Sequence, residues 1–220
     1  TSSTVAADLD RLRSLLDDHD DATNPTRRVF IKIGGFEALL PLLRSTSQDV
    51  TVLASALSVA GGAIQQDASN RDDIRESGVL LEAIKFLATK TEVSTELLHK
   101  AIYCVASATQ RVTANQAFVG ENGGIPLFVD LLQTVNSSRH LDLATFALQN
   151  CCEVDANIPR VRACENAGAL LALLAETGED DVPEQSMVVL RACGYIESSR
   201  PSLVKKGWAL KQPEIARLVG

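Results

Sequence analysis

Aromatic side chains and long apolar runs are both scarce in this chain of 220 residues. Phenylalanine, tyrosine and tryptophan together make up only 4% of it, so a core would consist mainly of alanine, leucine, valine and isoleucine, which suit closely packed helices. No apolar run approaches the ~20 residues that a membrane-spanning helix needs. The hydrophobic fraction of 45% is ordinary for a folded protein and excludes a wholly disordered chain.

Regularly spaced cysteines are also missing. Five are present, an odd number, and no Cys-x-x-Cys pair occurs, which argues against a disulfide framework and against a zinc site. Three of the five fall at apolar helix positions, so we interpret them as small buried apolar residues. The five are Cys104, Cys151, Cys152, Cys164 and Cys193.

Catalytic motifs are absent as well: there is no glycine-rich phosphate loop with a following lysine, no Gly-x-Ser-x-Gly and no His-Glu-x-x-His. The acidic run at 179–181 is more typical of a solvated loop than of a cation site. We therefore expect no enzyme activity, no cofactor, no metal and no small-molecule substrate. A cysteine-based enzyme is kept as an alternative, which rapid and selective alkylation of one thiol would support.

The net charge of −7 argues against nucleic acid as the main partner, because phosphates repel an acidic surface. The same charge permits basic partners, but it does not indicate them, because many soluble proteins with other functions carry a similar net negative charge.

One sequence motif occurs four times along the chain. Its clearest form is Gly123–Leu132, which reads Gly-Gly-Ile-Pro-Leu-Phe-Val-Asp-Leu-Leu, and the other copies begin at Gly34, Gly78 and Gly168. The four leading glycines are 44, 45 and 45 residues apart, a period typical of a helical solenoid. Because glycine permits a sharp backbone turn where a Cβ would clash, each of the four is predicted to be a hinge between helices.

Around each glycine the pattern predicts three helices. A short first helix precedes the glycine, the motif itself forms a second helix, and a polar loop then leads to a longer third helix. We predict a single domain over residues 1–220. Its parts are an N-terminal cap helix at 1–22, repeats at 26–68, 69–113, 114–155 and 156–198, and a C-terminal cap or partial repeat at 199–220. Pro201, Gly207 and Pro213 interrupt the pattern, and residues 215–219 are expected to be part of the cap.

Three helices per unit, the glycine hinge and the pattern Gly-small-Ile-Pro-x-Leu-Val-x-Leu-Leu together resemble the armadillo repeat over about residues 26–196. The asparagine that opens the first helix is present at Asn70 and Asn115, eight residues before its glycine, whereas Asn157 stands eleven residues before Gly168. The resemblance implies an all-α fold, a right-handed α-α superhelix of about four repeats plus terminal caps. HEAT repeats are the structural alternative, but they have two helices per unit and lack this glycine.

Armadillo arrays present a concave groove, lined by the third helices, to extended peptides or partner proteins. In peptide-binding members, an asparagine late in each third helix binds the ligand backbone, and a tryptophan four residues earlier flanks it. Only the third unit keeps a partial match to this pair, as Phe146 and Asn150, so an adaptor of the importin-α kind is not expected. The partner-binding groove implied by the resemblance comprises Lys100, Tyr103, Phe146, Gln149, Asn150, Glu153, Arg191 and Tyr195.

We therefore expect a non-enzymatic protein–protein interaction scaffold, monomeric and cytoplasmic, that binds a partner protein or an extended peptide in the groove. Attachment to a membrane through residues outside this sequence is left open. The alternative is an armadillo-type Hsp70 co-chaperone: some short, four-unit armadillo proteins clamp Hsp70 and promote nucleotide exchange, and this chain resembles them in size. Acceleration of ADP release from Hsp70 would distinguish the two hypotheses.

Overall fold

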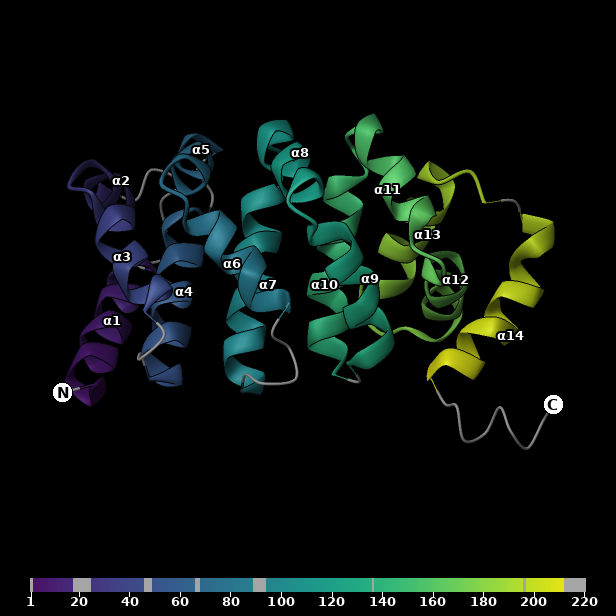
Figure 1. Cartoon of the computed structure of the whole chain (residues 1–220), viewed down its shortest axis with the longest axis horizontal. Helices are drawn as coiled ribbons and strands as arrows, with labels where there is room; N and C mark the ends of the chain where they lie inside the picture. The colour runs from purple at the N-terminus through teal and green to yellow at the C-terminus, as the bar shows by residue number, and fades with distance from the viewer. Residues whose placement is uncertain are drawn as a thin grey trace. The chain divides into compact units, whose positions relative to one another are not determined.

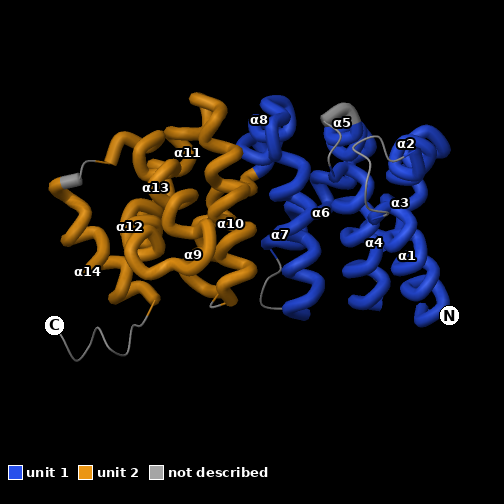
Figure 2. The backbone as a smooth tube through the Cα atoms, turned by 180° about the vertical axis from the view of Figure 1, so that it is seen from behind, with its two compact units in different colours: residues 1–122 blue, residues 123–220 orange. Residues whose placement is uncertain are grey.

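The computed structural model describes residues 2–17, 25–45, 49–65, 68–88, 94–135, 137–195 and 197–211. These residues form fourteen α-helices, two short 3-10 helices and no strand, so the predicted all-α fold is confirmed. The chain divides into two compact units, residues 1–122 and 123–220, which are coloured separately in Figure 2. The single domain with its repeat boundaries stays a prediction, and the expected cap at 215–219 lies outside the described residues.

Unit 1 contains the predicted cap helix and two complete three-helix repeats (Figure 1). Its helices are α1 (Ser2–Leu16), α2 (Pro25–Lys32), α3 (Gly35–Arg44), α4 (Val50–Ala63), α5 (Ala68–Glu76), α6 (Val79–Ala88), α7 (Thr95–Thr109) and α8 (Thr113–Glu121). Helices of the same kind stack on one another: α1 contacts α4 and α4 contacts α7, while α3 contacts α6 and α5 contacts both α2 and α8. The cap helix α1 therefore packs on α4, the third helix of the first repeat, in the same way as α4 packs on α7.

Unit 2 continues the same sequence of helices and ends with an additional one. Its elements are α9 (Gly124–Thr134), α10 (Ser138–Cys151), the 3-10 helix η1 (Asp155–Asn157), α11 (Ile158–Ala163), α12 (Ala167–Thr177), α13 (Val182–Ala192), the 3-10 helix η2 (Glu197–Ser199) and α14 (Arg200–Lys211). The long helices α10 and α13 contact each other, and α12 contacts α9, α13 and α14.

The long helices pack through small and aliphatic side chains, as their sequences predict. Leu57, Ile102 and Leu148 occupy the same position in successive long helices, and all three are completely buried. The alanine that precedes each of them is also completely buried, which lets neighbouring helices approach closely.

Three of the four predicted glycine hinges are confirmed. Gly34, Gly78 and Gly123 directly precede the second helix of their repeats, and each has a left-handed backbone with φ between 78° and 87°. Residues with a Cβ adopt this conformation at a cost, so glycine is favoured at all three positions.

The fourth predicted hinge, Gly168, is wrong. Gly168 lies inside α12, and Asn166 precedes that helix with φ −104°. Gly168 serves packing instead, because a Cβ there would lie 2.5 Å from Tyr195 Cζ. The opening asparagine Asn157 stands nine residues before Asn166, the residue that directly precedes the second helix, so the fourth repeat departs from the others by one residue rather than three.

Two of the residues expected to interrupt the chain after the fourth repeat lie within a helix. Pro201 is the second residue of α14, where the missing N–H of proline costs no helical hydrogen bond. Gly207 is buried in the middle of α14, and a Cβ there would overlap the carbonyl oxygen of Ala169 on α12. The glycine is therefore a close contact between two helices rather than a break.

The ends of the long helices are tied to the next short helix by buried side-chain amides. An asparagine at or near the start of α5, of α8 and of α11 donates to one of the last carbonyls of the preceding long helix. The bonds are Asn70 Nδ2 to Ala63 O at 3.1 Å, Asn115 Nδ2 to Ala108 O at 2.8 Å and Asn157 Nδ2 to Cys151 O at 3.0 Å. Terminal carbonyls have no partner within their own helix, so these amides satisfy groups that would otherwise be buried without a hydrogen bond.

The residue seven positions before each confirmed hinge also donates a hydrogen bond to a carbonyl at the end of the preceding long helix. The bonds are Arg27 Nε to Leu16 O at 2.8 Å, Arg71 Nε to Ile64 O at 3.3 Å and Gln116 Nε2 to Thr109 O at 2.9 Å. Two of the three donors are cationic, which also favours the negative end of the helix dipole.

Replacing Gly78 with valine tests the hinge. No atom outside its chain neighbours lies closer than 3.6 Å to a Cβ built on Gly78, so we attribute the expected loss to backbone strain rather than to a clash. We expect Gly78→Val to lower the free energy of unfolding by about 1–3 kcal/mol, measured by denaturant titration. Gly78→Asn is the matched control, because asparagine tolerates the left-handed region, and a loss as large as that of valine would contradict the explanation.

Replacing Asn115 with alanine tests the amide ties. Asn115 is completely buried and also donates to Arg71 O at 2.6 Å, so its removal leaves several buried groups without their partner. We expect a loss of about 1–3 kcal/mol in the free energy of unfolding. The control is Asn122→Ala, which removes an exposed amide and should change stability by less than about 0.5 kcal/mol. Equal losses of stability in the two variants would show that the hydrogen bonds of the buried Asn115 amide do not stabilise the fold.

Candidate functional site

The face of unit 1 formed by α1, α4 and α7 is hollowed into a groove of about 350 Å³, here named the α4 groove. Its lining residues are mostly small or polar and are Asp10, Val50, Thr51, Ala54, Ser55, Ser58, Ser94, Glu96 and Lys100. Two interactions order the lining: Ser55 Oγ donates to Asp10 Oδ1 at 2.8 Å, and Lys100 Nζ lies 3.2 Å from Glu96 Oε1. The groove therefore has polar groups of both signs and little side-chain bulk.

Of the predicted groove residues in unit 1, Lys100 lines the α4 groove and Tyr103 is largely committed to packing. The Tyr103 ring lies against α4, where a Cβ on Gly61 would be 2.7 Å from it, and its hydroxyl accepts a hydrogen bond from Gln65. Burial raises the pKa of Tyr103. Only part of this side chain is available to a partner.

The predicted residues of unit 2 differ in exposure. Glu153 and Arg191 are exposed, Phe146 and Gln149 are half-buried, and all but Glu153 lie on α10 or α13. Asn150 is only 4% exposed, so its side chain is nearly covered rather than open to the groove that the resemblance implies. Its role in binding stays a prediction.

Tyr195 is the eighth predicted residue, and it follows the end of α13. Its half-buried ring fills the space left by Gly168, and burial raises its pKa. In unit 2, a buried polar contact joins α10 to α13: Gln185 Nε2 donates to Asp142 Oδ1 at 3.0 Å, and Thr145 donates to Gln185. This contact holds the Asp142 carboxylate of α10 against α13.

Apart from Lys100, the predicted groove residues do not include those that line the α4 groove. The side of α4 that lines the groove carries Thr51, Ser55 and Ser58, and Ser58 stands one residue before the position where peptide-binding armadillo proteins place asparagine. That asparagine position holds Val59, which is completely buried. The spacing of four and three between the hydroxyl residues puts them on one helix face and was the available signal.

Burial shapes the chemistry of the cysteines. All five are free, four are buried and Cys164 is half-buried. Burial raises the pKa of Cys104 and of Cys151 to about 12, so both are protonated thiols at neutral pH and poor nucleophiles. In the part of the chain that the structure describes, no group of three or more His, Cys, Asp or Glu side chains is placed to hold a metal ion.

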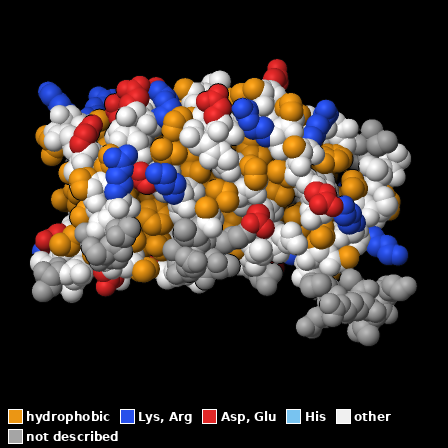
Figure 3. Space-filling view, in the orientation of Figure 1, with side chains coloured by type: hydrophobic (Ala, Val, Ile, Leu, Met, Phe, Trp, Pro, Cys, Tyr) orange, Lys and Arg blue, Asp and Glu red, His pale blue; other side chains and the backbone are white. Residues whose placement is uncertain are grey.

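Acidic and basic side chains are interspersed on the described face seen in Figure 3, rather than gathered into a patch of one sign. None of the described helices combines the length and apolar character required to cross a membrane.

Solved structures show which fold this chain is similar to. A designed armadillo repeat protein in complex with the peptide (KR)4 matches 92% of this chain and 80% of its own length, with a TM-score of 0.72 and 18% identity. The armadillo-repeats-only protein of Plasmodium falciparum matches 86% of this chain and 79% of its own length, with a TM-score of 0.66 and 19% identity. The armadillo-type fold expected from the sequence is therefore confirmed.

Sequence comparisons extend this result. U-box domain-containing protein 7 of Arabidopsis thaliana is 29% identical over 188 residues, which are 83% of this chain but only 22% of that protein. This chain thus spans about a fifth of the relative's length.

A family model described as the SIL1/FES1/HPBP1 C-terminal domain matches residues 26–148, from the start of α2 to near the end of α10. The match includes the α2–α7 repeats and the amide ties at Asn70 and Asn115. Because it covers more than half of the 220 residues, this chain belongs to the SIL1/FES1/HPBP1 C-terminal domain family.

Proposed function

We propose that this chain is an armadillo-type co-chaperone that binds an Hsp70 and accelerates the release of its nucleotide. The observation that carries the proposal is the family match over residues 26–148, together with the resemblance of the chain to short armadillo proteins that clamp Hsp70. The function needs no catalytic group of this chain.

The mechanism would be thermodynamic linkage. A protein that binds nucleotide-free Hsp70 more tightly than ADP-bound Hsp70 must weaken ADP binding by the same factor, because the coupling free energy between two sites is reciprocal. A protein with equal affinity for both forms would shift nothing, however tightly it bound. This chain would therefore act by holding Hsp70 in a form that retains ADP poorly.

The surface that we propose for the contact is the α4 groove of unit 1. Small side chains at Ser55 and Ser58 leave room for a partner to approach α4, and Asp10, Glu96 and Lys100 offer polar groups around them. The long helices that carry most of these residues are tied at their ends by buried amides, so the surface is preorganised and less ordering entropy is lost on binding. The partner is a protein, and we propose that this chain acts as a monomer in the cytoplasm.

The test is the release of a fluorescent ADP analogue from a purified Hsp70 ATPase domain, followed with and without this chain. We expect an acceleration of about tenfold, which corresponds to about 1.4 kcal/mol in the barrier to release. Release at the same rate at every concentration of the chain would contradict the proposal.

A matched pair of variants locates the contact. Ser58→Arg places a long cation in the α4 groove, and we expect it to abolish the acceleration by blocking close approach. Ala38→Arg adds the same side chain at an exposed position of α3, on another stack of helices, and should leave the acceleration unchanged. Circular dichroism would show that both variants are folded, and equal activity of the two would place the contact elsewhere.

The second candidate is a scaffold that binds the extended chain of another partner, as the designed armadillo protein does with its peptide. Phe146 and Gln149 would then provide the contact on α10, because both are partly exposed while Asn150 is not. Phe146→Ala should weaken capture of such a partner and leave ADP release from Hsp70 unaffected. The two functions are thus separated by measurements on the same variant.

A further inference from the structure

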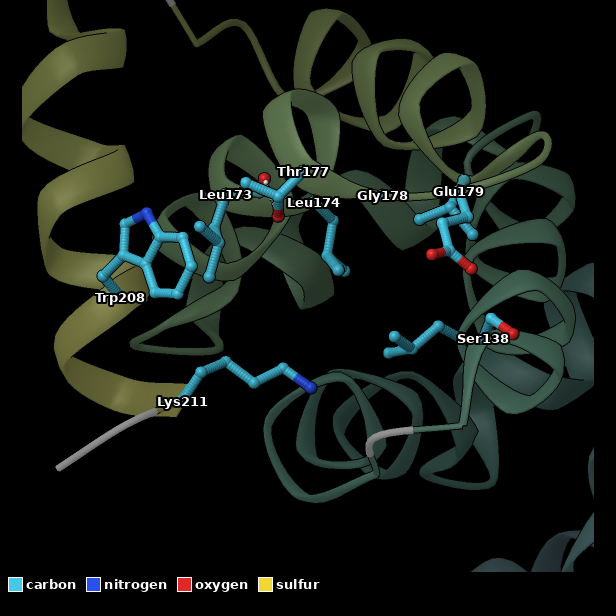
Figure 4. Close-up of a pocket in the computed structure, with 10 residues that line it drawn as sticks. Ser138, Leu173, Leu174, Thr177, Gly178, Glu179, Trp208 and Lys211 are labelled. Carbon is cyan, nitrogen blue, oxygen red and sulfur yellow. Dashed lines mark hydrogen bonds between the residues drawn. The ribbon is translucent and has the colours of Figure 1, made fainter. Parts of the chain in front are cut away.

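Unit 2 contains a second hollow, formed between α10, α12, α13 and the terminal helix α14 and here named the Trp208 cavity (Figure 4). Its volume is about 440 Å³, within the range of roughly 300–1,000 Å³ that ligand sites occupy. Its lining residues are Ser138, Leu141, Leu173, Leu174, Thr177, Gly178, Glu179, Val182, Trp208 and Lys211. None of them lines the α4 groove, so a ligand of this cavity would bind independently of the proposed Hsp70 contact.

One wall of the cavity is apolar. Leu173 and Leu174 come from α12, and the Trp208 ring stands beside them on α14 (Figure 4). Trp208 is 44% exposed, an unusual state for the largest apolar side chain, since burial of an aromatic ring contributes strongly to stability. Leu141 and Val182 complete this apolar lining. A ligand that enters here can bury the exposed ring face.

Lys211 places a cation at the edge of the same cavity. Its Nζ donates to the carbonyl oxygen of Val135 at 2.6 Å, and it forms no ion pair with any residue that the structure describes. Lys211 is half-buried, and this burial lowers its pKa. An ammonium has three donors, so at least two are free to bind an anionic oxygen.

The remaining charged group limits where a negative ligand charge can lie. Glu179 is on the other side of the cavity from Trp208 and Lys211 in Figure 4. It would repel a second carboxylate, whereas it can accept a hydrogen bond from a peptide N–H. The cavity thus offers one site for an anion, beside an apolar wall, and one acceptor.

We propose that the Trp208 cavity binds the C-terminal residue of a partner polypeptide, with the α-carboxylate on Lys211 and an aliphatic side chain against Leu173, Leu174 and Trp208. A C-terminal residue carries its carboxylate and its apolar side chain on the same Cα, which matches a cation that directly adjoins an apolar wall. An internal Asp or Glu would need a neighbouring residue to supply the apolar group. The peptide N–H groups preceding the terminal residue face the side that holds Glu179.

The test uses the fluorescence of Trp208, the only tryptophan of the chain, as the reporter. The probes are two tetrapeptides of the same sequence, acetyl-Gly-Ser-Gly-Leu, one with a free C-terminal carboxylate and one with a C-terminal amide. We expect the free acid to change the emission saturably and to bind at least about tenfold more tightly than the amide, since a hydrogen bond to a charged group is worth that factor or more. Equal affinities, or no change in emission with either peptide, would overturn the proposal.

Variants on α14 then separate the ammonium from the general charge of the helix. Lys211→Met should remove the difference between acid and amide, while Lys206→Met, an exposed lysine of the same helix, should preserve it. Melting curves would show whether Lys211→Met is folded; if it is not, the comparison of acid and amide on the unaltered chain still decides. Tighter binding of octanoate than of the peptide acid would contradict a polypeptide end and identify a site for free aliphatic acids.

Discussion

The long helices α4, α7 and α10 end inside the protein, and their last carbonyls must find donors there. The packed interior excludes water and the helix itself has no donor to offer, so the donors come from the next short helix: an asparagine after all three, and an arginine or glutamine beside it after α4 and α7. Asn115 shows how far the constraint extends. It also donates to the backbone of Arg71 and accepts from Arg75 Nη1 at 2.8 Å, so one side chain joins α7, α5 and α8. Adjacent helices of the repeats are therefore held together by hydrogen bonds to helix-terminal carbonyls as well as by apolar packing.

This constraint has a consequence for the exposed side of the long helices. A helix whose ends and inner face are fixed can present a polar face with small side chains without losing its position. In α4 that face carries Thr51, Ser55 and Ser58, of which Ser55 is buried and donates to Asp10 while Thr51 and Ser58 retain exposed surface. Such positions are free to be selected for binding, and the residues matched by the family model include this surface.

The repeat period correctly predicted the features that depend on local backbone geometry, namely the helix positions and three of the glycine turns. A 44–45-residue spacing located the helices of each repeat, and three glycines were correctly identified as left-handed turns because no other residue adopts that backbone as readily. Gly168 and Gly207 were misread for a shared reason. Both are glycines because another element approaches too closely for a Cβ, and this cause leaves no mark in the spacing.

The candidate site was predicted less well than the fold, again for a physical reason. The resemblance to peptide-binding armadillo proteins supplied positions on the third helices, but not how deeply each is buried. Asn150 keeps the residue type expected of an exposed ligand contact, yet it is nearly covered, whereas Ser58 has no distinctive type and lines a groove. Burial depends on how neighbouring helices pack, which a pattern along one helix does not contain.

Helix α14 shows how such packing creates a cavity. Gly207 lets α14 approach α12 so closely that the two backbones nearly touch at that point. A helix turns by about 100° per residue, so the next residue, Trp208, is carried to the edge of the contact, and Lys211, three residues later, returns to the same edge. The side chains at this edge are too far from the contact to be buried by it and too close to be fully solvated. A tryptophan and a lysine three positions apart, directly after a glycine of this kind, are thus the sequence signal for the Trp208 cavity, and the signal can be recognised only once the helix that packs on the glycine is known.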